Sequence, residues 1–563
     1  MKRITFFLTL ALVAACAKPQ PQAFQVIPMP ADVTLSEGAF LVKGTAIAVD
    51  PAMDEASKAA VQRFVQALET ATGTKTKQAD GGISFVLDPS LAPEEYVLDI
   101  QPKAVRVEAS ALNGFVYACE TLKQMLPAAI YGSVKAKADW VLPCGHIEDR
   151  PRFAYRGMHL DACRHFFSIE ETKRYLDVMT AYKLNRFHWH LTEDQGWRME
   201  VKAYPRLTEV GAWRNGTVIK KDWGSNDGIR YGGFYTQEEM KEIVAYAAER
   251  GITVIPEVDL PGHMVAALAA YPELGCTGGP YEVWTRWGVA PDILCAGNEA
   301  VYTFLETVLT ELVDVFPSEY IHIGGDEAFN EEMGIPWDHC PKCAAKMRQL
   351  GIKKGPMAKH YLQNYVTARM QDFLNSKGRK IIGWDEVLEG NLAPGATVMS
   401  WRGVKGGIEA ANKGFDAIMT PNSYLYFDYY QSQERDKEPF GIGGYLPVEN
   451  VYAYEPFEGL TPEAQPHILG VQANLWTEYV ATPEHLEYML LPRMCALSEV
   501  QWCAADRKDY ARFDASLDHS FAILDAMGMN YCKDVRGLIG LDRQPARSPE
   551  ELEEYLSKKD WGW

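Results

Sequence analysis

The chain has 563 residues and a formal net charge of −19, with 47 % hydrophobic and 23 % charged residues. This length predicts two or three domains, and the composition is typical of a globular protein. Acidic residues are spread along the chain without a basic stripe, which argues against nucleic acid as a partner.

The N-terminus has the order of an export signal. Met1-Lys2-Arg3 is basic, residues 4–13 are largely apolar, and small residues precede Cys16. The pattern resembles a bacterial lipobox and predicts a signal peptide over residues 1–15, with Cys16 as the lipidated first residue. An ordinary signal peptide cleaved near Ala15 is the alternative. We therefore expect an exported lipoprotein, periplasmic or on the cell surface, that contacts the membrane only through its lipid anchor.

The next segments predict a tether and a small domain. Residues 16–23 contain alternating prolines and are expected to form a short stiff tether. Residues 24–149 predict an α+β domain. In it, strand-like runs at 85–87, 96–98 and 104–107 alternate with helical stretches at 53–71 and 111–127. No later segment has the ~20 uninterrupted apolar residues of a membrane span.

From about residue 150, short apolar runs alternate with amphipathic helices. Eight such units predict an α/β fold, a (β/α)8 TIM barrel over residues 150–505. The runs are residues 154–161, 186–192, 252–259, 320–327, 380–386, 397–402, 416–422 and 468–476, and candidate helices lie at 169–183, 236–250, 298–315, 357–378 and 405–413. Residues 423–467 predict a long loop in place of a helix, 482–505 a closing helix, and 506–563 a short helical extension.

The cysteines give two local patterns. Besides Cys16 there are ten cysteines, too few per residue for a disulfide-built scaffold. Cys340-Pro-Lys-Cys343 has the spacing of half a zinc site, but no second such motif accompanies it. We therefore expect no metal there and interpret the pair as a local disulfide or free thiols. Cys276 and Cys295 bracket a Gly- and Trp-rich loop and are candidates for a disulfide.

Carboxylates and tryptophans recur where the apolar runs end. The carboxyl ends of barrel strands build the active site, so these positions are the candidate functional residues. Indoles around acids suit a sugar ring, which has apolar C–H faces and a rim of hydroxyls. Taken singly, a strand-end Trp is more often a core residue, and an Asp is often a helix cap. The residues are Arg156, Asp161, His190, Asp194, Glu257, Asp259, His263, Asp326, Glu327, Trp384, Asp385, Trp401, Arg402, Asn422, Trp476 and Glu478.

His188 and His190 have an alternative interpretation as metal ligands. They are two positions apart on a predicted strand, so both rings lie on one face, as in some zinc-dependent barrel hydrolases. The pair lies on the second run and not the first, and no strand-end Lys is present to bridge metals. We therefore interpret His190 as a satisfied polar group of the barrel.

Several longer motifs resemble glycoside hydrolase family 20, the β-N-acetylhexosaminidases. The resemblance covers about residues 24–530, with the motifs in the family's order. It implies the same fold, a small α+β domain followed by a (β/α)8 barrel. The motifs are residues 156–161, 188–197, 256–263, 322–327, 383–386, 399–402, 424–431 and 474–478.

The resemblance also explains the adjacent acids Asp326 and Glu327. Other retaining glycosidases place two carboxyls ~5 Å apart across the scissile bond, and inverting ones ~6.5–9.5 Å apart, which sequence neighbours do not easily achieve. In family 20 the substrate's own 2-acetamido oxygen attacks the anomeric carbon, so one protein acid suffices. The resemblance implies that Glu327 is the general acid/base and Asp326 stabilises the oxazolinium intermediate. Tyr426 would hydrogen-bond the acetamide carbonyl.

The remaining roles follow from the same resemblance. The implied partners of the ring and its acetamide methyl are Trp384, Trp401 and Trp476. Arg156, Asp428 and Glu478 would bind the outer hydroxyls, and Asp194 with His263 would form a relay behind Glu327. No cofactor or metal is implied. The chain departs from the family pattern at residue 193, where Glu replaces the common Asp.

The expected activity is exo-hydrolysis of terminal non-reducing β-linked N-acetylglucosamine or N-acetylgalactosamine, with retention. Two alternatives stay open. A disaccharide-releasing enzyme could keep the acetamide-facing residues and widen only the outer wall. A non-catalytic carbohydrate-binding protein would be free to lose Asp326, Glu327 or Tyr426, and all three are present.

Overall fold

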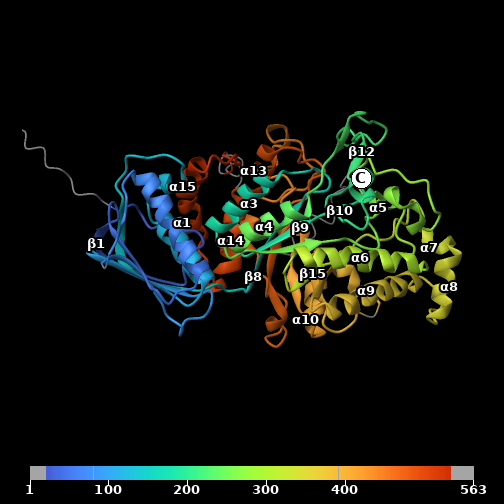
Figure 1. Cartoon of the computed structure of the whole chain (residues 1–563), viewed down its shortest axis with the longest axis horizontal. Coiled ribbons are helices and arrows are strands. Elements are labelled where there is room, and N and C mark those ends of the chain that lie inside the picture. Colours follow the sequence, from blue (N-terminus) through green and yellow to red (C-terminus); the bar gives the residue numbers. More distant parts are fainter. Residues whose placement is uncertain (1–20, 80, 391, 534, 536–563) are drawn as a thin grey trace, which may run out of the picture.

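The computed structural model describes residues 21–79, 81–390, 392–533 and 535, which form an N-terminal sheet domain beside a closed barrel (Figure 1). The predicted signal peptide, Cys16 and the last part of the C-terminal extension lie outside the described residues. Within the described part of the chain, no helix combines the length and apolar character that a membrane span requires.

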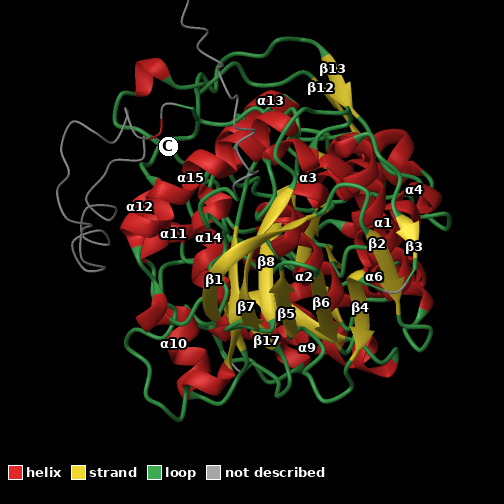
Figure 2. Cartoon of the chain, turned by 90° about the vertical axis from the view of Figure 1, so that its left-hand side faces the viewer, coloured by secondary structure: helices red, strands yellow, loops and turns green. Residues whose placement is uncertain are grey.

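The N-terminal domain is a mixed seven-stranded sheet with two helices (Figure 2). Pairing is antiparallel from β1 to β6 across the sheet and parallel from β6 to β3. In sheet order the strands are β1 (Asp32–Leu41), β7 (Val141–Asp149), β5 (Tyr96–Gln101), β6 (Ala104–Ala109), β4 (Gly82–Leu87), β2 (Ala46–Val49) and β3 (Lys77–Gln78).

The two helices of this domain are α1 (Glu55–Thr72) and α2 (Leu112–Gln124), close to the predicted stretches. Asp54 caps α1 by accepting a hydrogen bond from the Ser57 amide at 2.7 Å, and Gly73 ends it with a φ of 62°. Apolar residues three and four apart, such as Val61, Phe64 and Leu68, are buried in the domain core. The spacing of apolar residues in the sequence was therefore enough to locate α1 and α2.

All eight predicted runs form strands of one closed parallel barrel, which confirms the predicted fold class. The order around the barrel follows the chain, and β19 closes it by pairing with β8. The strands are β8 (Tyr155–Asp161), β9 (Arg186–His190), β14 (Thr253–Glu257), β15 (Tyr320–His322), β16 (Lys380–Trp384), β17 (Thr397–Ser400), β18 (Ala417–Met419) and β19 (Ile468–Ala473).

Helices surround this barrel. Two of them begin with capping boxes, Ser168 with Glu171 and Thr236 with Glu239. The helices between barrel strands are α3 (Ile169–Ala181), α4 (Gln237–Ala248), α5 (Val265–Ala270), α6 (Glu299–Val315), α7 (Pro336–His339), α8 (Pro341–Gln349), α9 (Ala358–Ser376) and α10 (Lys405–Asn412). Two hairpins, β10 (Thr192–Glu193) with β11 (Gly196–Trp197) and β12 (Trp213–Asn215) with β13 (Arg230–Gly232), extend the loop after β9.

The segment predicted as a long loop, 423–467, contains mostly loop but includes α12 (Val448–Ala453) and most of α11 (Asn422–Leu425). The closing segment consists of two helices, α13 (Pro483–Leu490) and α14 (Arg493–Trp502), because Pro492 interrupts a single helix. The helix α15 (Tyr510–Ala526) forms the described part of the extension and runs beside the N-terminal domain in Figure 1.

The two domains meet at the amino-terminal ends of the barrel strands. Asp149 at the end of β7 accepts hydrogen bonds from Lys183 (2.9 Å), Tyr96 (2.6 Å) and the Trp502 indole (2.8 Å). Lys183 is fully buried, just before β9, so this ion pair is closed to solvent. Since the active site of such barrels lies at the opposite end of the strands, the N-terminal domain leaves it uncovered.

Candidate active site

A cavity of about 250 Å³ opens at the carboxyl end of the barrel. Its volume lies just below the ~300–1,000 Å³ range of common ligand pockets, so it suits a single small ring. The loops after β8 and after β15 to β19 supply its walls. The lining residues are Arg164, Asp326, Glu327, Trp384, Trp401, Asn422, Tyr426, Asp428, Tyr429, Ile442, Trp476 and Glu478.

The adjacent acids lie on a tight turn after β15. Gly324 and Gly325 have φ angles of 62° and 104°, and a Cβ on Gly324 would stand 1.7 Å from the Asp259 carboxylate. Only glycine fits that approach. Glu327 itself has a φ of 43°, a left-handed conformation that is uncommon for a side-chain-bearing residue and is found at functional sites. This turn brings both carboxylates to one cavity although they are sequence neighbours.

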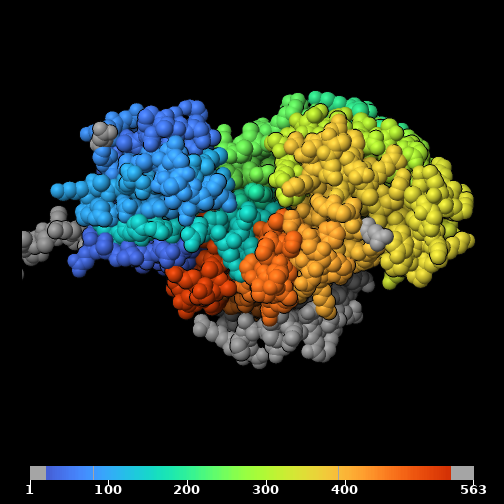
Figure 3. All heavy atoms as spheres, turned by 90° about the horizontal axis from the view of Figure 1, so that it is seen from below, coloured from blue at the N-terminus to red at the C-terminus, as the bar shows by residue number. Residues whose placement is uncertain are grey.

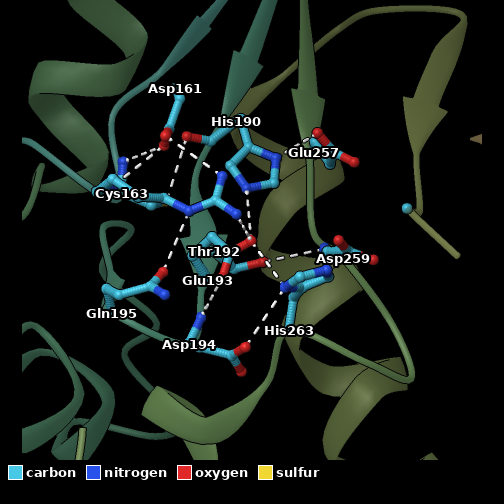
Figure 4. A network of polar contacts seen from close by, with 12 residues as sticks. Asp161, Cys163, His190, Thr192, Glu193, Asp194, Gln195, Glu257, Asp259 and His263 are labelled. Carbon is cyan, nitrogen blue, oxygen red and sulfur yellow. Dashed lines mark hydrogen bonds and ion pairs between the residues drawn. The ribbon is translucent and has the colours of Figure 1, made fainter. Parts of the chain in front are cut away.

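A chain of ionisable groups stands behind Glu327, and Figure 4 shows His263, Glu193 and Asp194 from it. His263 Nε2 lies 3.7 Å from Glu327 Oε2 and 3.8 Å from Asp326 Oδ2. Its Nδ1 atom lies 2.9 Å from Glu193 Oε1 and 3.4 Å from Asp194 Oδ2. The sequence predicts a relay of Asp194 and His263, with Glu193 only a departure from the family pattern. In the structure Glu193 is the closer partner of the imidazole.

Asp194 has a different set of contacts. Its carboxylate accepts hydrogen bonds from the backbone amides of Val265 (3.0 Å) and Ala290 (3.1 Å), so it joins the loops after β9 and β14. Glu193 instead pairs with the Arg164 guanidinium at 2.6 Å. We infer that Asp194 positions the loop that carries His263, and that Glu193 holds the charge of the imidazole.

The environment of Glu327 gives its carboxyl an unusual acidity. Burial raises the pKa of Glu327 most, the charge of His263 lowers it and the negative charge of Asp326 raises it, and together these effects give a pKa of about 7. The side chain is 44 % exposed, and its open side faces the cavity. Burial lowers the pKa of His263, but the charge of Glu193, the hydrogen bonds to Asp194 and Glu193 and the charge of Asp326 outweigh this effect and raise the pKa. A carboxyl with a pKa near 7 above a cationic imidazole can both donate and accept a proton near neutral pH.

Three indoles and a phenol form the apolar part of the cavity. Trp384 is 1 % exposed, and its indole N–H donates to Glu257 Oε1 at 2.9 Å. The Trp476 ring lies 5.9 Å from that of Trp384, and the Tyr426 ring stacks with Trp401 at 6.2 Å. These contacts hold the rings at fixed angles around the cavity, which suits the C–H faces of a sugar and an acetamide methyl.

The opposite side of the cavity is acidic and has free hydrogen-bonding capacity. Asp326 Oδ1, Asp428 Oδ1 and Glu478 Oε2 are buried oxygens without a hydrogen-bond partner. Buried polar atoms are normally paired, so these three indicate a ligand rich in O–H and N–H donors. Burial raises the pKa of Asp428, and the charge of Glu478 adds to the effect. The guanidinium of Arg164 lies 5.0 Å from the Trp476 ring centre and supplies the positive charge on this side.

Arg156 does not belong to the site, contrary to the prediction from sequence. It is the second residue of β8 and is 1 % exposed. Its guanidinium donates to Glu94 (2.9 Å) and Tyr117 (2.6 Å) of the N-terminal domain. Asp161 lies five residue positions further along the extended strand, which corresponds to about 16 Å. Arg164, which the sequence analysis did not select, provides the arginine of the cavity.

Beneath the cavity lies a buried carboxylate surrounded by imidazoles. Glu257 contacts His188 at 3.0 Å, His190 at 2.5 Å and His322 at 2.8 Å. These contacts, led by the charge of His322, lower the pKa of Glu257 against the effect of burial. His190 is thus a partnered polar group of the barrel interior, as its position on the second run indicated. The cluster supports Trp384, whose indole binds the same carboxylate.

A barrel with a tryptophan-lined cavity, an acid with a raised pKa and unpartnered carboxylate oxygens defines a glycoside hydrolase. Two family models match the chain: "Glycosyl hydrolase family 20, catalytic domain" over residues 153–505, and "Glycosyl hydrolase family 20, domain 2" over residues 23–150. The chain therefore belongs to glycosyl hydrolase family 20.

Individual relatives agree with this assignment. A β-hexosaminidase of Porphyromonas gingivalis is 40 % identical over 550 residues, covering 94 % of this chain and 68 % of the relative. A β-hexosaminidase of Akkermansia muciniphila is 34 % identical, covering 77 % and 85 %. The solved family 20 β-N-acetylhexosaminidase of Streptomyces coelicolor A3(2) superimposes with a TM-score of 0.79 at 31 % identity, covering 91 % of this chain and 98 % of that one.

Proposed function

We propose that this protein is an exo-acting, retaining β-N-acetylhexosaminidase that removes terminal non-reducing N-acetylglucosamine or N-acetylgalactosamine by substrate-assisted catalysis. The observation that carries the proposal is the pair Asp326 and Glu327 in one cavity. The pKa of Glu327 is about 7, as an acid/base near neutral pH requires, and beside it Asp326 presents a buried oxygen without a hydrogen-bond partner. Support also comes from a Streptomyces plicatus β-hexosaminidase mutant, solved with its product GlcNAc, which superimposes with a TM-score of 0.79.

In the proposed reaction, protonated Glu327 gives its proton to the glycosidic oxygen as the bond to the anomeric carbon breaks. The substrate's acetamide oxygen attacks the same carbon and forms an oxazolinium ion. Asp326 accepts the acetamide N–H and offsets the positive charge. Ionised Glu327 then takes a proton from water, which attacks the anomeric carbon from the face that the leaving group left. This attack opens the oxazolinium ring, and the two successive inversions retain the configuration. Attack within one molecule avoids much of the entropy cost of bringing two groups together.

The charge around Asp326 favours this role. Burial raises the pKa of Asp259, and the negative charge of Asp326 adds to this effect. Burial also raises the pKa of Glu386, whose indole partner is Trp401 at 3.0 Å. Their raised pKa values limit the negative charge that Asp259 and Glu386 contribute, and Asp326 is the acid of this group that lines the cavity, with an unpartnered oxygen. The small cavity favours release of one sugar over release of a disaccharide.

We expect a strong preference for substrates that carry the acetamide. Turnover of an aryl β-N-acetylglucosaminide should exceed that of the matching β-glucoside by at least about 10³-fold, because the glucoside lacks the internal nucleophile. The two chromogenic substrates share a leaving group, so the ratio of their kcat/KM values reports the acetamide alone. Equal turnover of both would refute substrate assistance.

We also propose that the chain is exported and anchored through lipid on Cys16. Support comes from the order of basic, apolar and small residues before Cys16. A single anchor of this kind holds the protein at a membrane surface without a spanning helix. Mass spectrometry of the mature N-terminal peptide decides the question: diacylglycerol on Cys16 is expected, and a mature chain that begins elsewhere would contradict it.

A further inference from the structure

Four cysteine sulfurs meet at the end of the molecule farthest from the N-terminal domain, where α7 and α8 lie in Figure 1 and where the yellow surface ends in Figure 3. The residues are Cys276, Cys295, Cys340 and Cys343, and their Sγ atoms all lie within 4.8 Å of one another. The pairs 295–340 and 295–343 are both 3.7 Å apart, and the pair 276–343 is 3.8 Å apart.

These distances have a chemical meaning. Zinc binds cysteine sulfur at about 2.3 Å with tetrahedral geometry, so neighbouring sulfurs of such a site stand about 3.8 Å apart. A disulfide would bring two sulfurs to about 2.05 Å. All ten cysteines of the described residues are free thiols. The candidate disulfide between Cys276 and Cys295 is therefore not formed in this structure, and Cys340 and Cys343 are free thiols, one of the two interpretations that the sequence left open. The spacing of the sulfurs matches the edges of a tetrahedron.

We propose that these four cysteines bind one structural Zn²⁺ ion. Three of them, Cys295, Cys340 and Cys343, are at most 4 % exposed, and Cys276 is partly exposed. Four thiolates complete the coordination of zinc and leave no open position, as in structural and unlike catalytic zinc sites. The proposal does not depend on the glycosidase activity.

The backbone around the four sulfurs is built for close approach. Cys340 precedes α8 and Cys343 lies in its first turn, where a helix N-terminus favours thiolate. Gly297 packs directly on this turn: a Cβ there would stand 2.1 Å from the Lys342 carbonyl carbon. The Cys295 amide donates to Leu274 O at 2.9 Å, which sets Cys295 beside Cys276. Each pair of sulfurs is thus positioned by its own backbone contacts.

The proposed ion would join two loops that support the active site. The segment after Glu327 leads to Cys340 and Cys343, and Asn330 in it donates to Val289 O at 2.7 Å. The loop between Cys276 and Cys295 contains Ala290, whose amide binds the Asp194 carboxylate. The metal would therefore brace the loops around Glu327 and its relay without touching substrate.

The sequence contains no second C-x-x-C motif, so by itself it predicts no metal here. The second pair, Cys276 and Cys295, is separated by 19 positions and becomes a pair only through the bridge between Gly275 and Leu294. Exported proteins also encounter oxidising conditions, in which two disulfides are the competing outcome. The experiment therefore has to count metal and thiols on the same sample.

The test is elemental analysis of the full-length protein, purified without a chelator or a metal-affinity step. We expect about one zinc per chain, with all four thiols released for titration when the protein is denatured with a chelator. Cys340→Ser and Cys276→Ser should each lower the zinc content at least about tenfold, since a structural site needs its four ligands. Cys119→Ser, a buried cysteine of α2 outside the cluster, is the matched control and should keep the metal.

If a variant does not fold, the zinc and thiol content of the wild-type protein still tests the proposal. Cobalt substitution adds a second readout, because tetrahedral thiolate coordination gives an intense sulfur-to-cobalt charge-transfer band, which Cys340→Ser should weaken. A chain that contains no zinc and has lost four thiols to disulfides would overturn the proposal. So would free thiols that take up no zinc at saturating concentration, or iron in place of zinc.

Discussion

Replacement of Glu327 with Gln is expected to lower kcat for a β-N-acetylglucosaminide with a sugar leaving group by about 10²–10⁴-fold, the usual contribution of a general acid. The amide has nearly the same shape but cannot give a proton to the leaving oxygen. For an aryl substrate with an acidic phenol the loss should be smaller, because that leaving group departs without full protonation. Steady-state kinetics with a series of phenols measures this dependence.

The pH profile provides an independent reading of the same residue. Burial raises the pKa of Glu327 to about 7, so the carboxyl is protonated below that pH and is lost as an acid when the pH rises through it. Wild-type kcat/KM should therefore fall on the alkaline side near pH 7, and Glu327→Gln should lack this limb. Glu332→Gln, an exposed Glu on the same loop, is the matched control and should keep the wild-type profile. An unchanged alkaline limb in Glu327→Gln would remove it as the acid.

Replacement of Asp326 with Asn is expected to lower kcat by about 10²–10³-fold, the cost of losing one preorganised electrostatic contact to the transition state. The Asn side chain can still accept a hydrogen bond from the acetamide, but it has no charge to offset the oxazolinium ion. Because the lost contact matters most at the charged intermediate, KM should change far less than kcat.

Binding of two ligands separates this role from structural damage. A cyclic thiazoline analogue of the intermediate should lose affinity for Asp326→Asn by about the same factor as kcat/KM, as transition-state analogues do. Affinity for the free sugar product should change little. Asp372→Asn, on the exposed face of α9, is the control and should bind both ligands like the wild type. Equal loss for both ligands would mean that Asp326 only shapes the cavity.

The two acids owe their different roles to the turn that carries them. Gly324 and Gly325 allow the chain to pass close to Asp259, and the left-handed Glu327 then directs its carboxyl to the side facing His263. Adjacent side chains on an extended strand would point to opposite faces. The carboxylates of Asp326 and Glu327 reach one cavity because the chain leaves the extended conformation before Asp326.

Much of this protein could be predicted from sequence because it depends on local pattern. The apolar runs reflect strands that are buried on both faces, and the amphipathic helices between them are buried on one face; all eight runs became barrel strands. Parallel strands in a closed barrel end at the same edge, so residues that follow the runs, such as Asp326, Trp384 and Glu478, share one cavity.

The tertiary structure decided what depends on strand direction and on contacts between distant loops. Arg156 and Arg164 lie at opposite ends of β8 and its loop. The direction of the strand therefore places Arg156 against Glu94 and Arg164 in the cavity. Glu193 became the partner of His263 because two loops meet there. The four cysteines came together for the same reason: residues far apart in sequence are neighbours only after the barrel has closed, and no local periodicity records that distance.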